Sequence, residues 1–95
     1  MEQVTDRWGN RIGLTDERWQ HIIEGHPELE EFQNEVLETI RKGRRRQDPI
    51  DPQKYKYIYP AQGLSFGSTH IVVVVKLVSK SFVLTAYGIE KKGGR

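Results

Sequence analysis

Two histidines five residues apart are the side chains in this sequence best suited to acid–base chemistry. His21 and His26 begin and end the segment His-Ile-Ile-Glu-Gly-His, and histidine is the side chain whose ordinary pKa lies nearest neutrality. On one continuous helix this spacing turns the two rings about 140° apart, so we predict no shared metal site and no cofactor. Each histidine is a candidate general acid or base. The alternative is that His26 bonds to backbone at a helix corner and that His21 is solvated.

A second group of candidates lies in the apolar C-terminal part of the chain. Lys76 lies within a run of valine and leucine, where a charged group is costly unless it reaches water or an anion. Together with Thr85 and Tyr87 it would hold and orient a phosphate group, and His70 is a further candidate on the same surface. The alternative is that Lys76 reaches solvent through its flexible stem and that Thr85 and Tyr87 are ordinary strand residues.

Basic residues gather in the middle of the chain. Arg44, Arg45 and Arg46 are consecutive, and Lys54 follows in a segment that alternates lysine and tyrosine. Guanidinium and ammonium groups bind phosphates, and tyrosine rings stack on bases. These four residues are therefore candidate phosphate contacts. The alternative is a solvated basic loop.

Strand periodicity predicts a β-hairpin that positions the C-terminal candidates. Residues 70–77 and 82–87 are rich in β-branched side chains and are joined by four residues, which favours an antiparallel pair. If Leu77 pairs with Phe82, side-chain alternation gives the hairpin an apolar face and a mixed face. The apolar face would carry Ile71, Val73, Val75, Leu77, Phe82, Leu84 and Ala86. The mixed face would carry His70, Val72, Val74, Lys76, Val83, Thr85 and Tyr87.

Two amphipathic helices are predicted to cover the apolar face. Thr15 is a suitable N-cap for the first helix. Pro27 cannot continue that helix but suits the first position of the next, so a corner is expected at His26. The second helix would run to about Lys42, before Gly43.

Two further segments are predicted to be extended. Residues 54–59 alternate lysine and isoleucine with tyrosine, as a strand does. Residues 4–14 have turn residues between short strand-like pieces, which indicates a small hairpin or an extended arm. We expect Trp8 in this arm to cover the core, and the alternative is that it stacks on a base.

The chain of 95 residues is predicted to form one domain, residues 1–95. The expected fold is α+β, with two N-terminal helices packed on one face of an antiparallel sheet of about four strands. There is no cysteine, so disulfides are excluded and the cytoplasm is favoured. The longest apolar run, residues 71–75, is far shorter than the roughly 20 residues of a membrane span. We therefore expect a soluble, cytoplasmic protein without a membrane segment.

Charge is distributed unevenly, although the net charge is only +2. Residues 15–38 carry eight acidic side chains against one arginine, whereas residues 39–95 carry twelve Lys and Arg against three acids. Such asymmetry indicates that a polyanion, or an acidic partner protein, meets the C-terminal half. The alternative is that the acidic helix surfaces and basic strand ends are simply solvated.

A resemblance to a known family runs from about residue 10 to residue 92. It is carried by Ile-Gly-Leu-Thr-Asp-Glu-Arg-Trp-Gln-His-Ile-Ile-Glu-Gly-His-Pro-Glu at residues 12–28, by Val-Val-Val-Val-Lys at residues 72–76 and by Phe-Val-Leu-Thr-Ala-Tyr at residues 82–87. This arrangement resembles small phage and bacterial members of the barnase, EndoU, colicin and RelE-like (BECR) ribonuclease superfamily. The resemblance implies helices on one side of an antiparallel sheet and an RNA site on the other side.

The resemblance further implies metal-independent cleavage of RNA. That reaction needs a base for the 2′-hydroxyl, an acid for the leaving 5′-oxygen and cations for the phosphorane. His21 or His26 would serve as base or acid, Thr85 or Tyr87 as an orienting donor, and Lys76 with one of the three consecutive arginines as a phosphate clamp. Two alternatives stay open: a non-catalytic RNA- or protein-binding module, and a toxin-like nuclease controlled by an acidic antitoxin or immunity-type protein.

Overall fold

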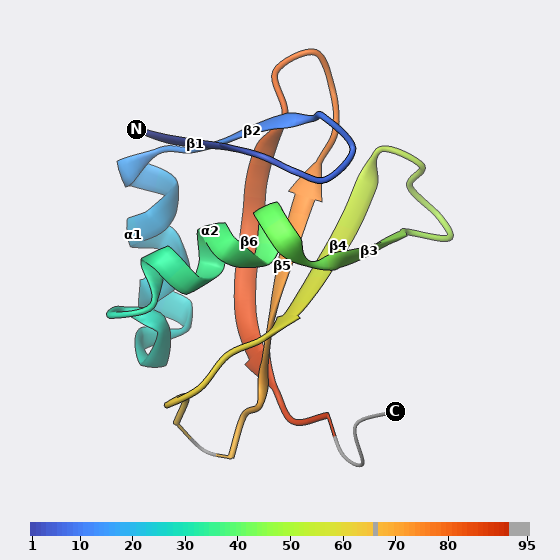
Figure 1. The fold of residues 1–95 in the computed structure, drawn as a ribbon. Helices are drawn as coiled ribbons and strands as arrows, with labels where there is room; N and C mark the ends of the chain where they lie inside the picture. Colours follow the sequence, from blue (N-terminus) through green and yellow to red (C-terminus); the bar gives the residue numbers. More distant parts are fainter. Residues whose placement is uncertain (66, 92–95) are drawn as a thin grey trace.

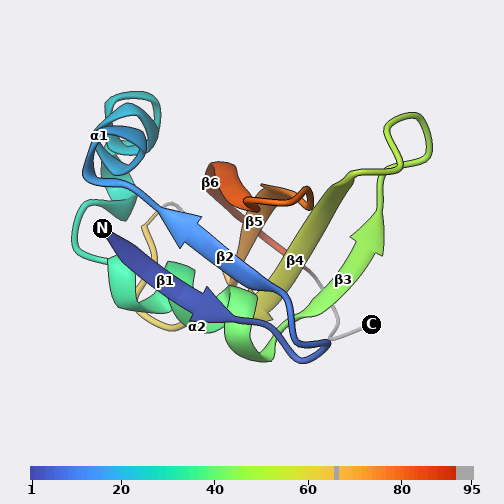
Figure 2. The same cartoon turned by 90° about the horizontal axis from the view of Figure 1, so that it is seen from above.

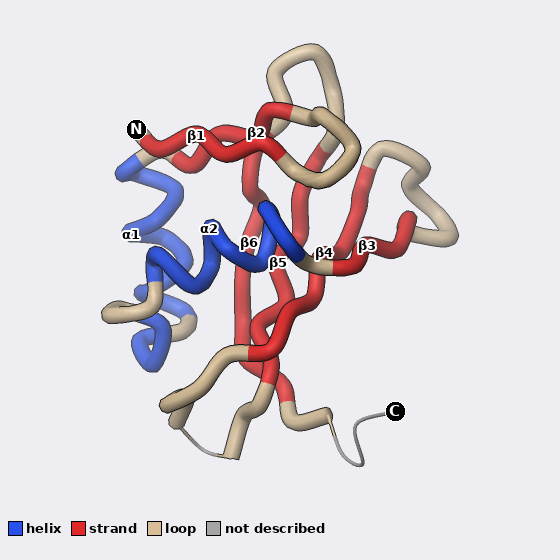
Figure 3. Tube along the Cα trace, viewed as in Figure 1, coloured by secondary structure: helices blue, strands red, loops and turns tan. Residues whose placement is uncertain are grey.

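The computed structural model describes residues 1–65 and 67–91, which form six strands and two α-helices (Figures 1 and 3). The strands are β1 (Glu2–Thr5), β2 (Arg11–Leu14), β3 (Arg44–Gln47), β4 (Lys54–Pro60), β5 (His70–Lys76) and β6 (Phe82–Ile89). The helices are α1 (Asp16–Gly25) and α2 (Gln33–Lys42), with a 3-10 turn, η1 (Pro27–Leu29), between them. Neither of these helices has the length and apolarity needed to cross a lipid bilayer.

All six strands belong to one sheet in the order β1-β2-β6-β5-β4-β3. Neighbouring strands run antiparallel except β2 and β6, which meet in parallel where Gly13 pairs with Phe82. The sheet curls into a half-barrel, and Figure 2 shows β3 and β4 extending to one side of β5 and β6. The curl gives the sheet an inner face that holds the core and an outer face.

The predicted fold, two N-terminal helices on an antiparallel sheet of about four strands, is wrong in three respects. The β1–β2 hairpin precedes both helices, the β2–β6 contact makes the sheet mixed, and β3 adds an edge strand. Strands β1, β2 and β3 have four residues each, which is too short for a clear periodicity. Their places in the sheet depend on pairings with distant parts of the chain, which local sequence does not reveal.

The core lies between the inner face of the sheet and the two helices. Helix α2 packs against β4, β5 and β1, and α1 lies beside β6 (Figure 1). The buried apolar side chains that form this core include Val4, Ile12, Leu14, Trp19, Ile22, Leu29, Val36, Ile40, Tyr57, Ile71, Val73, Val75, Val83 and Ala86. The outer face of β5 and β6 carries Val72, Val74, Thr85 and Tyr87, and the two valines are buried although they lie outside this core.

The sequence predicted most of the register between β5 and β6. Val72 pairs with Tyr87 and Val74 with Thr85, as expected. A bulge then leaves Leu84 without a partner, so that Val75 pairs with Val83. Beyond the bulge the predicted faces are therefore wrong: Val83 is buried in the core, and Phe82 is 37% exposed.

Local signals predicted the start of α1, the corner at His26 and the end of α2 correctly. The expected start of the second helix at Pro27 is wrong, because Pro27–Leu29 form the 3-10 turn η1 and α2 begins only at Gln33. The Thr15 hydroxyl accepts a hydrogen bond of 3.1 Å from the backbone N–H of Arg18, as an N-cap does. The corner at His26 separates α1 from η1, which begins at Pro27. Gly43 ends α2, and its backbone N–H donates to the carbonyl of Thr39.

Gly43→Ala is expected to destabilise the protein by about 1–3 kcal/mol. A Cβ atom at this position would lie 2.6 Å from the carbonyl oxygen of Ile58 and would also meet the carbonyl of Thr39. Both neighbours are backbone atoms of a helix and a strand, so neither can move aside cheaply. Urea denaturation would measure the change in the free energy of unfolding.

Gly25→Ala is the matched control, because a Cβ atom at Gly25 would meet no atom within 4 Å. Alanine there is expected to leave stability unchanged or slightly raised, since alanine lowers the entropy of the unfolded chain. Equal stabilities for the two variants would show that the close contact at Gly43 relaxes at little cost.

Candidate functional site

The outer face of the sheet carries a groove of about 410 Å³ that crosses from β3 to β6. We call it the sheet groove. Strand pairing places Arg44, Ile58, Val72 and Tyr87 in one row across it, and Arg46, Lys56, Val74 and Thr85 in the next. Its lining residues are Arg44, Arg45, Arg46, Lys56, Ile58, Val72, Tyr87, Ile89 and Lys91. The floor is therefore apolar with one phenol, and the rim is cationic.

The rim cations of the sheet groove are not neutralised by nearby acids. Among the residues that the structure describes, no carboxylate lies within ion-pair distance of Arg44, Arg46, Lys56 or Lys91. Four positive groups around one hollow raise the local concentration of anions. The groove thus has the electrostatics of a site for a phosphate chain.

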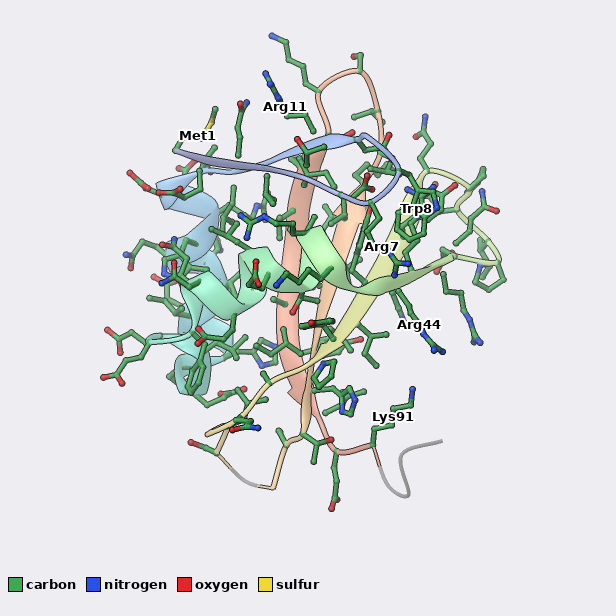
Figure 4. The ribbon with its side chains drawn as sticks, in the orientation of Figure 1. Met1, Arg7, Trp8, Arg11, Arg44 and Lys91 are labelled. Atoms are coloured by element: carbon green, nitrogen blue, oxygen red, sulfur yellow. The ribbon has the colours of Figure 1, made fainter. Side chains whose placement is uncertain are left out.

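A second hollow of about 360 Å³ continues the sheet groove around the end of β4. We call it the edge cavity. It shares Arg44, Ile58 and Lys91 with the sheet groove and is also lined by Arg7, Lys42, Tyr59, Pro60 and His70. Figure 4 shows Arg44 and Lys91 projecting from the same side of the molecule, with Arg7 above them. The positive surface therefore extends from the outer face around the edge of the sheet.

His26 lies beside the sheet groove, next to Tyr87. The centroids of the two rings are 6.0 Å apart, because α1 lies along β6 and His26 is its C-cap. The Nδ1 atom of His26 is 3.3 Å from Oε2 of Glu28. This contact orients the imidazole and leaves Nε2 available to a bound substrate.

His70 lies on the other side of Tyr87. It pairs with Ile89 and is therefore a diagonal neighbour of Tyr87 on the same face of the sheet. Its Nδ1 atom is 2.7 Å from the hydroxyl of Thr69, which again leaves Nε2 available. The structure thus places the ring of His26 against Tyr87 and places His70 as a diagonal neighbour of Tyr87 in the sheet.

Lys76 and Lys54 do not join this group. Lys76 shares the face of Tyr87 but lies four residues further along β5 than the partner of Tyr87, a separation of about 13 Å. Its ammonium group forms an ion pair with Asp51. The hydrogen bond from Lys76 and a second one from the backbone N–H of Gln53 both lower the pKa of Asp51. Lys54 pairs with Lys76 in the neighbouring strand, also near Asp51. The charge of Lys76 is therefore balanced within the protein.

His21 and Thr85 do not line the sheet groove. His21 is exposed on α1, and no side-chain hydrogen bond to it occurs in residues 1–65 and 67–91. Thr85 faces the same side of the sheet as Tyr87 but is absent from the lining of the sheet groove. Of the five predicted catalytic residues, the structure brings together His26 and Tyr87.

Arg45 points to the opposite side of β3 from Arg44 and Arg46. Its guanidinium is 3.2 Å from the buried carboxylate of Asp6 and stacks on two rings, 4.1 Å from the centroid of Trp8 and 4.7 Å from that of Tyr55. Of the three consecutive arginines, Arg44 and Arg46 therefore direct their side chains to the face of the sheet groove, and the guanidinium of Arg45 lies on the other face. The reason is strand alternation, which sends adjacent side chains to opposite faces.

Sequence reasoning missed four cations of this surface: Lys56, Lys91, Arg7 and Lys42. The period of β4 places Lys56 on the face of Ile58, so alternation was a usable signal for it. Lys91 and Arg7 come from segments outside the central strands, and only the fold brings them beside Arg44. Trp8 does not cover the core as expected, since 49% of its surface is exposed.

The arrangement can bind a phosphate between cations and present two imidazoles and a phenol to it. No family model matches this chain, and neither a curated protein nor a solved structure matches it.

Proposed function

We propose that the protein is a metal-independent ribonuclease of the cytoplasm that binds RNA in the sheet groove. The proposal is carried by one observation: His26 contacts Tyr87 in a groove where Arg44, Arg46, Lys56 and Lys91 have no carboxylate within ion-pair distance among the described residues. A groove of that kind attracts a phosphate chain, and histidine supplies the acid–base chemistry that phosphodiester cleavage requires. The resemblance of residues 12–28, 72–76 and 82–87 to BECR ribonucleases supports the same proposal.

Each group has a role in the proposed reaction. One imidazole, His26 or His70, removes the proton of the 2′-hydroxyl, whose oxygen attacks the adjacent phosphorus. The other imidazole protonates the 5′-oxygen as its bond to phosphorus breaks, leaving a 2′,3′-cyclic phosphate and a 5′-hydroxyl. Tyr87 donates a hydrogen bond to the phosphorane, and Arg44 and Lys91 balance its charge.

RNA fits the groove better than an isolated phosphate does. Ile58, Val72 and Ile89 provide an apolar floor beside the cations, and such a floor accommodates a ribose or a base while the rim holds the phosphates. The 2′-hydroxyl that the two imidazoles would activate is present in RNA and absent from DNA.

RNA binding is tested with Arg44→Ala/Arg46→Ala. The double variant should bind single-stranded RNA more weakly, and the slope of log affinity against log salt should fall by about 1.4, because two phosphate contacts are lost at about 0.7 each. Fluorescence anisotropy at several salt concentrations measures both quantities. Arg11→Ala/Lys80→Ala removes the same charge from a different hollow and is expected to leave the slope unchanged. Equal slopes for the two double variants would contradict the proposed groove.

Cleavage is tested with total RNA in the presence of EDTA. The wild-type protein should produce fragments that end in a 2′,3′-cyclic phosphate. RNA with 2′-O-methyl groups should bind but stay intact, since it lacks the attacking hydroxyl. If the protein binds RNA in the sheet groove but leaves it uncleaved, the proposed ribonuclease activity is refuted.

That result would favour the second candidate, a non-catalytic RNA-binding module. One observation supports this alternative: the cationic groove is complete, whereas Lys76, predicted to clamp the reacting phosphate, is paired with Asp51.

A further inference from the structure

Trp8 is an exposed indole that the fold holds in a fixed position. It lies in the turn between β1 and β2, where Oδ1 of Asp6 accepts the backbone N–H groups of Trp8 at 2.9 Å and of Asn10 at 2.8 Å. Gly9 closes the turn with a φ of +88°, a conformation that suits glycine. The turn thus presents Trp8 to solvent with 49% of its surface exposed.

Two guanidinium groups lie close to the indole ring. Arg45 lies 4.1 Å from the ring centroid and is itself held by Asp6 and Tyr55. Arg7 lies 5.5 Å from the same centroid. Arg45 packs against the ring, and the exposed side chain of Arg7 adds a second positive charge next to it.

Arg7 connects Trp8 to the rest of the basic surface. It lines the edge cavity together with Arg44 and Lys91, and those two residues also line the sheet groove. Its guanidinium donates to the backbone carbonyl of Lys42 at 3.5 Å, at the end of α2. Figure 4 shows Trp8, Arg7, Arg44 and Lys91 in succession down one side of the molecule.

We propose that Trp8 is a stacking platform for an unpaired base of a single-stranded RNA that runs from the sheet groove through the edge cavity. This inference rests on the RNA-binding part of the proposed function and specifies the substrate as single-stranded. The phosphates follow Lys91, Arg44 and Arg7, and a base at the end of this path lies against the indole.

The charge around Trp8 favours a nucleic acid over a protein partner. An exposed indole flanked by two arginines and followed by further cations combines the two features that bind single strands, a stacking ring and a basic path for phosphates. Bases in a duplex are stacked on one another and offer no free face to the ring. The stacking platform therefore favours single-stranded RNA over duplex RNA.

The experiment measures the affinity of a fluorescein-labelled oligouridine with 2′-O-methyl sugars, which cannot be cleaved. Trp8→Ala should bind it about tenfold more weakly than wild type, because stacking on an aromatic side chain contributes strongly to each base contact. Trp8→Phe, which keeps a ring, should restore most of the affinity. Binding of an RNA duplex should be the same in all three proteins.

Ile50→Ala is the matched control, since Ile50 is another exposed apolar side chain, 90% exposed, in the loop between β3 and β4. It should bind the oligouridine as wild type does. Urea denaturation of each variant would establish that the turn still folds.

The two proposals fail in different ways. Unchanged affinity of Trp8→Ala for the oligouridine, with weaker binding by Arg44→Ala/Arg46→Ala, would overturn the stacking platform and leave the sheet groove as an RNA site. Absence of cleavage with a loss of affinity in Trp8→Ala would overturn the ribonuclease and support the platform. Equal losses for oligouridine and duplex would contradict base stacking.

Discussion

His26→Ala is expected to lower the rate of the proposed RNA cleavage by about 10²–10⁴-fold, the usual contribution of a positioned acid or base. His26 is the imidazole that contacts Tyr87, with its ring centroid 6.0 Å away, and Glu28 holds its Nδ1 atom. Its backbone N–H closes the end of α1 by donating to Ile22, a bond that alanine keeps. Binding of RNA to the cations should therefore change little, so that the loss appears in the single-turnover rate at saturating protein.

His21→Ala is the matched control on the same helix. It also removes one imidazole, but His21 is exposed on α1 and is not among the residues that line the sheet groove. We expect its cleavage rate to stay within about twofold of wild type, since the acid–base groups remain in place. Similar rates for the two variants, both near wild type, would remove His26 from the reaction. A loss of cleavage in His21→Ala but not in His26→Ala would show that His21, and not His26, is the acid or base.

Asp6→Ala is expected to reduce the free energy of unfolding by about 3–5 kcal/mol, as when one partner of a buried ion pair is removed. The Asp6 carboxylate is fully buried and accepts hydrogen bonds from the buried hydroxyl of Tyr57 and from Arg45. Without it, both donors lose their acceptor, and the turn that holds Trp8 loses two backbone hydrogen bonds. Such a loss is a large part of the stability of a small domain.

Denaturant unfolding of Asp6→Ala and Asp16→Ala would measure this difference. Asp16 is the control, because its side chain is 90% exposed and it lies in the first turn of α1. Its removal should cost at most about 1 kcal/mol. Equal effects of the two substitutions would mean that the buried network around Asp6 contributes little beyond surface electrostatics.

The hydrogen bonds around Asp6 also make the stability of the protein depend on pH, with lower stability in acid. Burial by itself would raise the pKa of Asp6, but the hydrogen bonds from Tyr57, Asn10 and Trp8 outweigh it and hold the pKa below 3.8. The stabilisation is therefore present above pH 3.8 and is lost as the pH falls through the lowered pKa. Accordingly, the gap in stability between wild type and Asp6→Ala should narrow in acid. Burial and the Asp6 hydrogen bond likewise raise the pKa of Tyr57.

Sequence analysis identified the elements whose signals are local. The cap at Thr15, the corner at His26 and the end of α2 at Gly43 each depend on a few adjacent residues. The alternation of β5 and β6 also placed Tyr87 and Thr85 on the face of Val72 and Val74, as the structure has them. Its limit was the bulge at Leu84, because an extra residue leaves no mark on the pattern of apolar side chains.

Part of the candidate site could also be predicted from the sequence. The sequence predicted His26 from its residue type at a helix corner, Tyr87 from strand alternation and Arg44 from the run of arginines, and the structure places all three in or beside one groove. Lys76 was chosen on the same grounds. Its pairing with Asp51, 25 positions earlier in the chain, depends on the loop before β4 and carries no local signal.

The sequence by itself determined where α1 begins and ends, where α2 ends, which face of the last hairpin is apolar as far as the bulge, and that the C-terminal half is positive. Tertiary structure alone decided that β2 joins β6, that Arg45 turns inward to Asp6, and that Arg7, Arg44 and Lys91 share one surface. The physical reason is the distance along the chain over which each kind of interaction acts. Caps, turns and side-chain alternation act between residues within a few positions, whereas strand order and ion pairs across the sheet depend on contacts whose free energy appears only when the whole chain is folded.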